Sequence, residues 1–254
     1  DEHMADRLRG KRVLLTGGVA NIGLEILRAF LSEGATVTLV DIDAARGEML
    51  EHELSPQVRF IRADLTDEAQ IRAAVLAAEK WMGGIDTLCL NAGIQVSGGI
   101  HELPVEKWDL TFTINVRANY ILVRESLAFL KVGGKSTITL MSSLAGKRGG
   151  PGITAYSASK AAVIGMANSF ALELAPHGIR VNAVCPGWVD TPFNGPIIGF
   201  LGGKDAQKDL VSRAVPLGRQ AMPSEVAPTF VFLASDESSY ITAQAINIDG
   251  GAYN

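Results

Sequence analysis

Strand-like and helix-like stretches alternate along the whole chain, and this alternation limits the folds that the chain can adopt. Short runs of apolar and β-branched residues occupy positions 12–15, 36–40, 58–61, 87–90, 136–140, 180–184 and 245–248. Longer stretches with helical periodicity lie between most of them, at 22–32, 68–81, 105–130 and 155–174. Apolar strands separated by amphipathic helices favour parallel strands joined by right-handed crossovers. The pattern predicts an α/β fold with about seven parallel strands and helices on both faces of the sheet.

The chain has 254 residues and no change in composition that would mark a linker between domains. We therefore expect a single domain over residues 5–254, and we interpret residues 1–4 as a cloning remnant. An eight-stranded α/β barrel has a similar length, but it would need eight comparable units with even spacing. The segment 186–222 is rich in glycine and proline, with one short helical piece near 205–213, and it is predicted to be a substrate lid.

Composition argues against several classes of partner. Apolar residues make up 47% of the chain and charged residues 20%, which suits a globular core. The net charge is −4 with no basic cluster, so no nucleic-acid partner is expected, and no apolar run is long enough to suggest a membrane segment. The four histidines lack metal-ligand spacing, so no metal site is predicted. The two cysteines lie in apolar runs, which favours a reducing cytoplasm.

A glycine-rich turn follows the first strand-like run and opens the first helix. The segment reads Thr16-Gly17-Gly18-Val19-Ala20-Asn21-Ile22-Gly23. Such a turn lets backbone N–H groups and a helix N-terminus face a pyrophosphate. The predicted sheet is thus a Rossmann-type, doubly wound sheet with a dinucleotide on this turn.

Asp41 directly follows the second strand-like run, where a dinucleotide fold places the carboxylate that binds the ribose hydroxyls. A carboxylate here repels the extra phosphate of NADP, and the neighbouring Val19, Ala20 and Ile42 offer that phosphate no cation. NAD is the predicted cofactor. Two further loops follow strand-like runs and are expected at the same crevice; they contain Asp64 and Leu65, and Asn91, Ala92 and Gly93.

Tyr156 and Lys160 lie four residues apart on the helix predicted at 155–174, so they share one helix face. A free phenol has a pKa of about 10, and a nearby cation lowers that pKa, which suits a general acid–base. Ser143 lies just beyond a strand end, from which its hydroxyl could reach the substrate oxygen beside Tyr156. Its neighbour Ser142 is the alternative candidate for this role.

The sequence resembles the short-chain dehydrogenase/reductase family in its compact form of about 250 residues. The motifs occur in the family's order from about residue 11 to 251, as Thr16-Gly17…Gly23, Asp41, Asp64, Asn91-Ala92-Gly93, Asn115, Ser143, Tyr156…Lys160, Pro186-Gly187 with Thr191, and Asp249-Gly250-Gly251. The resemblance implies that Tyr156 exchanges the proton, that Lys160 binds the nicotinamide ribose and lowers the phenol's pKa, and that Ser143 orients the substrate oxygen. It also implies that Asn115 holds a water that relays protons to Lys160.

The resemblance further implies that Asp64 contacts the adenine and that the segment 186–191, with Pro186, Gly187, Val189 and Thr191, holds the nicotinamide carboxamide. Asn21 departs from the family's pattern, since it replaces the middle glycine of the loop. Asparagine tolerates positive φ better than most residues, and its amide could cap the following helix. Cofactor binding is therefore expected to survive this change.

The substrate pocket is expected to be lined by 94–97, 144–153 and the lid from 188 to about 211. Candidate substrate residues are Gln95, Ser97, Arg148, Trp188 and Phe193. Arg148 could pair with an anionic group or simply be a solvated loop residue. The apolar lid suits a small hydrophobic or alicyclic substrate, and equally suits packing against the core or a second subunit.

These features together predict an NAD-dependent oxidoreductase that moves a hydride between nicotinamide C4 and a secondary alcohol or ketone, as an alcohol, polyol or diol dehydrogenase. The alternatives are a carbonyl reductase and a non-catalytic nucleotide-binding regulator. A homotetramer is implied by the resemblance alone.

Overall fold

The computed structural model describes residues 6–253 and contains one seven-stranded parallel sheet. Residues 1–4, interpreted above as a cloning remnant, lie outside the described residues. The strands are β1 (Arg12–Thr16), β2 (Thr36–Asp41), β3 (Val58–Arg62), β4 (Thr87–Leu90), β5 (Thr137–Met141), β6 (Arg180–Pro186) and β7 (Ala245–Ile248). Their order is β3-β2-β1-β4-β5-β6-β7, with every neighbouring pair parallel. The predicted Rossmann-type sheet of about seven parallel strands is confirmed.

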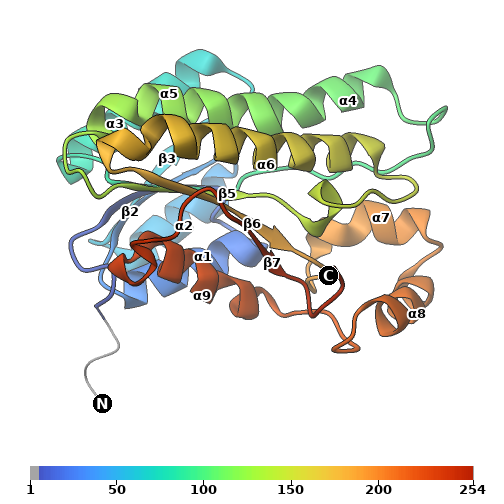
Figure 1. The fold of residues 1–254 in the computed structure, drawn as a ribbon. Coiled ribbons are helices and arrows are strands. Elements are labelled where there is room, and N and C mark those ends of the chain that lie inside the picture. The colour runs from blue at the N-terminus through green and yellow to red at the C-terminus, as the bar shows by residue number, and fades with distance from the viewer. Residues whose placement is uncertain (1–5, 254) are drawn as a thin grey trace.

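Helices cover both faces of this sheet (Figure 1). One face carries α3 (Glu68–Met82), α4 (Val105–Phe112), α5 (Ala118–Leu130) and α6 (Thr154–Leu174), and the other carries α1 (Asn21–Ser32), α2 (Ala44–Leu54) and α9 (Pro223–Ala234). Each layer has its own apolar cluster, one centred on residues such as Ile71, Ile121 and Val163, the other on Ile26, Leu50 and Val226. Among the described residues no helix is long and apolar enough to cross a membrane.

The central strands are buried along their whole length because they are covered on both sides. Every residue of β4 and of β5 is buried. Aspartates begin two of the helices: Asp43 accepts a hydrogen bond from the N–H of Arg46, and Asp67 accepts from the N–H groups of Ala69 and Gln70. These are common N-cap interactions, and each leaves the following helix with a satisfied first turn.

The long helix predicted at 105–130 is interrupted in the structure. Between α4 and α5 the chain forms a π-helical turn, Thr113–Arg117, which contains Asn115. A π-helical turn inserts a residue into the helix without breaking it, so the apolar periodicity continues across it and the sequence pattern does not reveal it.

The lid region is more helical than predicted. It contains α7 (Gly195–Phe200) and α8 (Lys204–Ala214), although only the second was foreseen as a short helical piece. Gly195 and Pro196 open α7, and proline is tolerated in the first turn because its missing N–H would have no partner there. The two ends of the lid are paired, since the N–H of Ala221 donates to Trp188 O at 2.9 Å and the N–H of Asp190 donates to Ala221 O at 2.8 Å.

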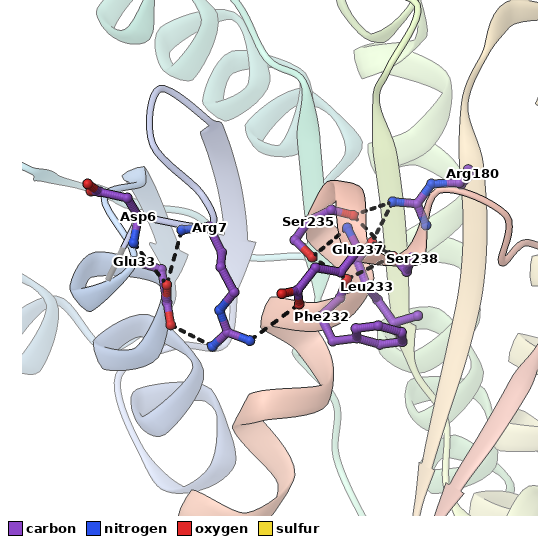
Figure 2. Close-up of polar contacts among 9 residues, drawn as sticks. All are labelled: Asp6, Arg7, Glu33, Arg180, Phe232, Leu233, Ser235, Glu237 and Ser238. Atoms are coloured by element: carbon purple, nitrogen blue, oxygen red, sulfur yellow. Dashed lines mark hydrogen bonds and ion pairs between the residues drawn. The ribbon is translucent and has the colours of Figure 1, made fainter. Parts of the chain in front are cut away.

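Two arginines tie the end of α9 to the rest of the fold (Figure 2). The Arg180 guanidinium, at the start of β6, donates to the carbonyl oxygens of Leu233 (3.0 Å) and Ser235 (2.9 Å), and also to Ile241 O at 3.2 Å. Arg7 pairs with Glu33 at 2.5 Å and with Glu237 at 3.5 Å. Arg180 thereby satisfies carbonyls at the C-terminal end of α9, which have no partner within the helix.

We predict that Arg180→Met destabilises the protein by about 1–3 kcal/mol, because three half-buried carbonyl groups lose a charged donor. The free energy of unfolding from urea titration measures this loss. Arg213→Met is the matched control: Arg213 is exposed on α8 and, within residues 6–253, pairs only with Asp209, so its loss should cost below about 1 kcal/mol. Equal losses in the two variants would contradict the role given to Arg180.

Candidate active site

The carboxyl ends of the strands open onto a cavity of about 780 Å³. The residues predicted to bind cofactor, substrate or proton converge there from loops far apart in the sequence. The cavity is lined by Gly17, Asn21, Ile22, Gly23, Asp41, Ile42, Asp64, Leu65, Asn91, Ala92, Gly93, Gln95, Ser143, Arg148, Tyr156, Lys160, Pro186, Gly187, Trp188, Val189, Thr191 and Phe193. Three other predicted residues, Thr16, Ser97 and Asn115, do not line it.

Thr16 and Asn91 brace the glycine-rich loop from behind. The buried Thr16 hydroxyl accepts a hydrogen bond from Ala92 N at 3.2 Å, and the Asn91 amide donates to Gly17 O at 2.8 Å. Thr16 therefore positions the loop through Ala92 rather than facing the cavity, which differs from its expected cofactor contact. The Asn91 side chain in turn holds the carbonyl of Gly17 in place.

The glycine-rich loop has no room for side chains at the positions where it turns. A Cβ atom at Gly23 would overlap the carbonyl oxygen of Gly17 and would lie 2.5 Å from the Asn91 amide nitrogen. Asn21 has φ +53°, so the positive φ considered above is confirmed. Its amide does not cap α1, contrary to expectation: the N-cap is Ala20, with no side-chain cap hydrogen bond. The first N–H groups of α1 are thus left for a ligand, which suits a pyrophosphate.

Asp41 is the last residue of β2 and points its carboxylate to the cavity wall. Its Oδ1 accepts a hydrogen bond from Asp43 N at 3.1 Å. Burial raises the pKa of Asp41, while the backbone N–H donors around it act in the opposite direction. Asp64, by contrast, is nearly exposed, and its pKa is lowered mainly by hydrogen bonds from Thr66.

Tyr156 and Lys160 lie one turn apart on α6, and both side chains are buried. The Lys160 ammonium is 5.8 Å from the centroid of the Tyr156 ring and donates to Met141 O at 2.9 Å. Burial raises the pKa of Tyr156 to about 12, with hydrogen bonding to Ser143 acting against it. Burial also lowers the pKa of Lys160 to about 8. Within the protein itself, burial thus has a larger effect on the pKa of the phenol than the lowering expected from Lys160.

The structure distinguishes Ser143 from its neighbour Ser142. The Ser142 hydroxyl is buried and donates to Lys160 O at 2.8 Å, so it fastens the end of β5 to α6. Ser143 comes next, at the N-cap of the short 3-10 turn Leu144–Gly146, and its hydroxyl lies beside the Tyr156 phenol. Ser143 is therefore the serine placed to contact a substrate oxygen.

Asn115 is fully buried in the π-helical turn, and its side chain forms hydrogen bonds with the backbone of the loop that follows β4. Its Oδ1 accepts from Ile94 N at 2.8 Å, and its Nδ2 donates to Ile94 O and to the Ser159 hydroxyl, each at 3.0 Å. A Cβ atom at Gly93 would lie 3.1 Å from Asn115 Oδ1 and 3.3 Å from Lys160 Nζ, so glycine there lets both polar groups approach. The sequence identified Asn115 but not this clamp on Ile94.

Several apolar side chains of the predicted lid line the cavity, and one of them lies beside Tyr156. The Phe193 ring lies 6.1 Å from the Tyr156 ring, at a 59° tilt, and Phe200 packs over Gly152. Ile197, Leu201 and Leu210 also line the cavity. Several apolar side chains of this segment thus line the cavity, while Phe200 packs on Gly152 and stays partly exposed.

Arg148 lies exposed at the cavity rim and donates to Ala252 O at 3.1 Å, while Lys147 donates to Ala245 O at 2.7 Å. The C-terminal segment is thereby fastened to the loop that follows Ser143. Sequence reasoning missed these contacts and also missed Asn194, which lines the cavity while its amide donates to Val189 O at 2.6 Å. Its position inside the predicted lid was the one available signal.

Comparisons with known proteins agree with this geometry. The model of a family described as enoyl-(acyl carrier protein) reductase matches residues 18–253. Galactitol 2-dehydrogenase of Agrobacterium fabrum is 38% identical over 96% of this chain and 98% of its own. The 3-alpha-(or 20-beta)-hydroxysteroid dehydrogenase of Mycobacterium tuberculosis is 37% identical over 98% of this chain and 91% of its own. The chain belongs to the short-chain dehydrogenase/reductase family.

Solved structures of this family share the fold along nearly the whole chain. The 3-ketoacyl-(acyl-carrier-protein) reductase of Brucella melitensis, in complex with NADH, superposes with a TM-score of 0.88 at 31% identity, over 96% of this chain and 99% of that one. A second structure from Brucella melitensis, described as a glucose/ribitol dehydrogenase, gives a TM-score of 0.87 at 29% identity, over 99% and 100%. The protein is accordingly an oxidoreductase that acts on CH–OH groups and takes a nicotinamide cofactor.

We predict that Gly23→Ala weakens NADH binding at least about tenfold, because the new methyl group must displace the loop on which the pyrophosphate would lie. NADH fluorescence titration measures the affinity. Gly149→Ala is the control, since a Cβ atom at this cavity-lining glycine meets nothing within 4 Å. An unchanged affinity in Gly23→Ala would show that the loop does not carry the cofactor.

Proposed function

We propose that the protein is an NAD-dependent dehydrogenase that interconverts a secondary alcohol and a ketone, with Tyr156 as general acid–base. The observation that carries this proposal is the convergence of Tyr156, Ser143 and Lys160 on the cavity that the glycine-rich loop also faces. A protein that only bound a nucleotide would have no need of all of these groups together with Asn115. The non-catalytic alternative is therefore disfavoured.

In the oxidising direction the Tyr156 phenolate takes the hydroxyl proton of the substrate, and Ser143 holds the oxygen as it becomes a carbonyl. Bound NAD would supply nicotinamide C4 as the hydride acceptor. Lys160, with a pKa of about 8, remains mostly protonated at pH 7 and provides a positive charge 5.8 Å from the phenol ring centroid. Ketone reduction uses the same residues with the phenol as proton donor, so a role as a carbonyl reductase needs no other group.

Asn115 occupies its amide with Ile94 and Ser159, so its part in proton transfer would run through a water rather than through its own side chain. Gly93 leaves open the space between Asn115 Oδ1 and Lys160 Nζ. We therefore propose that a water held near Asn115 relays protons to Lys160.

NAD is the proposed cofactor because the carboxylate of Asp41 lies at the cavity wall beside the glycine-rich loop. A carboxylate accepts hydrogen bonds from both ribose hydroxyls and repels a 2′-phosphate. The neighbouring Ile42 is 57% exposed and offers no positive charge.

We also propose that the protein is a homotetramer and that it is located in the cytoplasm. Apolar side chains remain uncovered on the outer surfaces of α5 and α6, where Tyr120 is 51% and Leu172 76% exposed. Such surfaces commonly lie in subunit contacts. Cys89 and Cys185 are buried free cysteines, which suits a reducing compartment. Sedimentation as a monomer would contradict the assembly.

We expect Tyr156→Phe to lower kcat at least about 1,000-fold, because the variant keeps the ring and loses the proton-transferring hydroxyl. Turnover is followed as NADH formation with a panel of secondary alcohols and polyols, and NADH affinity is measured by fluorescence. The affinity should stay within about twofold of the wild-type value, since the change leaves the loop and α1 intact. Retained turnover would remove Tyr156 from the reaction.

Asp41→Ala should reduce the preference for NAD over NADP by a factor of about 10–100, because it removes both the ribose acceptor and the charge that repels the phosphate. The ratio of kcat/KM for the two cofactors, measured with one alcohol, gives the preference. Asp43→Ala serves as the control, since Asp43 also lines the cavity but caps α2. A wild-type enzyme that preferred NADP would overturn the assignment of Asp41.

A further inference from the structure

A half-buried glutamine on the cavity wall has a buried amide oxygen without a hydrogen-bond partner. Gln95 Oε1 is shielded from solvent and accepts no hydrogen bond from any part of the chain that the structure describes. A buried polar atom without a partner costs about 1–3 kcal/mol, and native proteins satisfy the great majority of such atoms. Because the Gln95 side chain also lines the cavity, its amide is placed to find a partner on a ligand there.

The loop that carries Gln95 is fixed at both ends. Asn115 holds the N–H and the carbonyl of Ile94, the residue immediately before Gln95. At the other end, Gly98 N donates to Gly152 O at 2.9 Å, and Gly152 lies under Phe200 of the lid. Gln95 is thus held on a short segment that is anchored at Ile94 and at Gly98, and a shift of this loop toward solvent would break these contacts.

The cavity itself offers Gln95 few alternative partners. Several lid side chains that line it, among them Phe193, Ile197 and Leu201, are apolar and donate no hydrogen bond. The amide of Asn194, which also lines the cavity, already donates to Val189 O at 2.6 Å. Ser97 Oγ is also buried without a partner, but Ser97 does not line the cavity. Of these two orphaned groups on the loop, Gln95 alone can meet a ligand.

We propose that Gln95 is a specificity-determining residue that hydrogen-bonds a second hydroxyl of the substrate, on a carbon other than the one that is oxidised. This inference rests on the proposed function and narrows its substrate class to diols and polyols. A primary amide both accepts and donates, and a hydroxyl does the same, so the two match in either orientation of the amide. An anionic substrate group would instead gain more from the guanidinium of Arg148 at the rim.

A site that hydrogen-bonds a substrate hydroxyl discriminates strongly against an analogue without it, because the buried polar group is then left unpaired. Wild-type enzyme should therefore favour a vicinal diol over the matching mono-alcohol by about 10- to 100-fold in kcat/KM. Two matched pairs serve as probes: butane-2,3-diol with butan-2-ol, and cyclohexane-1,2-diol with cyclohexanol.

Gln95→Met keeps the length of the side chain and removes the amide, so the ratio of diol to mono-alcohol kcat/KM should fall to near one. Ser97→Ala is the matched control on the same loop and should leave the ratio at its wild-type value. A wild-type ratio near one, or a ratio that Gln95→Met does not change, would overturn the inference. An equal loss on both members of a pair would show a merely structural role and would overturn it too.

Binding without turnover separates this inference from the proposed reaction. Added to the NADH-loaded protein, the diol should raise the Tm more than the mono-alcohol does, and Gln95→Met should abolish that difference. If no alcohol reduces NAD while this difference is present in wild type and lost in Gln95→Met, the proposed reaction fails and the role of Gln95 stands. If the diol and the mono-alcohol shift the Tm equally in the wild-type protein, the role of Gln95 fails.

Discussion

In a parallel sheet every strand ends at the same edge, and the rest of this structure depends on that constraint. The loops after β1, β2, β4, β5 and β6 all open onto one cavity because the crossovers return each strand in the same direction. Groups that are far apart in the sequence thereby come together: the glycine-rich turn, Asp41, the loop at Asn91 and the serine beside Tyr156. The fold supplies the convergence, and the individual side chains supply the chemistry.

Around that cavity, polar side chains hold the main chain of the loops that form it. Thr16 and Asn91 fix the cofactor loop, Ser142 fastens β5 to α6, and Asn115 clamps the backbone of Ile94. Rigid positioning of this kind is what proton and hydride transfer require, since misplacement by about 1 Å costs rate steeply. Burial has a second effect, because it favours the uncharged form of both side chains. It raises the pKa of Tyr156 and lowers the pKa of Lys160. The positive nicotinamide ring of a bound oxidised cofactor would act in the opposite direction on the phenol.

The order of strands and helices could be predicted because hydrophobic periodicity and turn residues are local signals. The family motifs likewise located Tyr156, Lys160 and Ser143 before any geometry was available. The π-helical turn at Asn115 was not predicted, since one inserted residue leaves the helical periodicity of the sequence intact. The helix α7 was not predicted because glycine and proline, which it contains, are typical of loops. Partners such as Ile94 for Asn115, or Ala252 for Arg148, depend on tertiary contacts that no local pattern encodes.

The central claim is that hydride passes directly between the carbon of a secondary alcohol and the cofactor within this one cavity. Transfer of deuterium tests it most directly. The purified protein is given NAD and a secondary alcohol or diol deuterated at the carbinol carbon, and the products are examined by mass spectrometry and NMR. The account predicts one deuterium on C4 of the NADH formed, on a single face, with none released to solvent. Deuterium appearing in water while unlabelled NADH accumulates would contradict it.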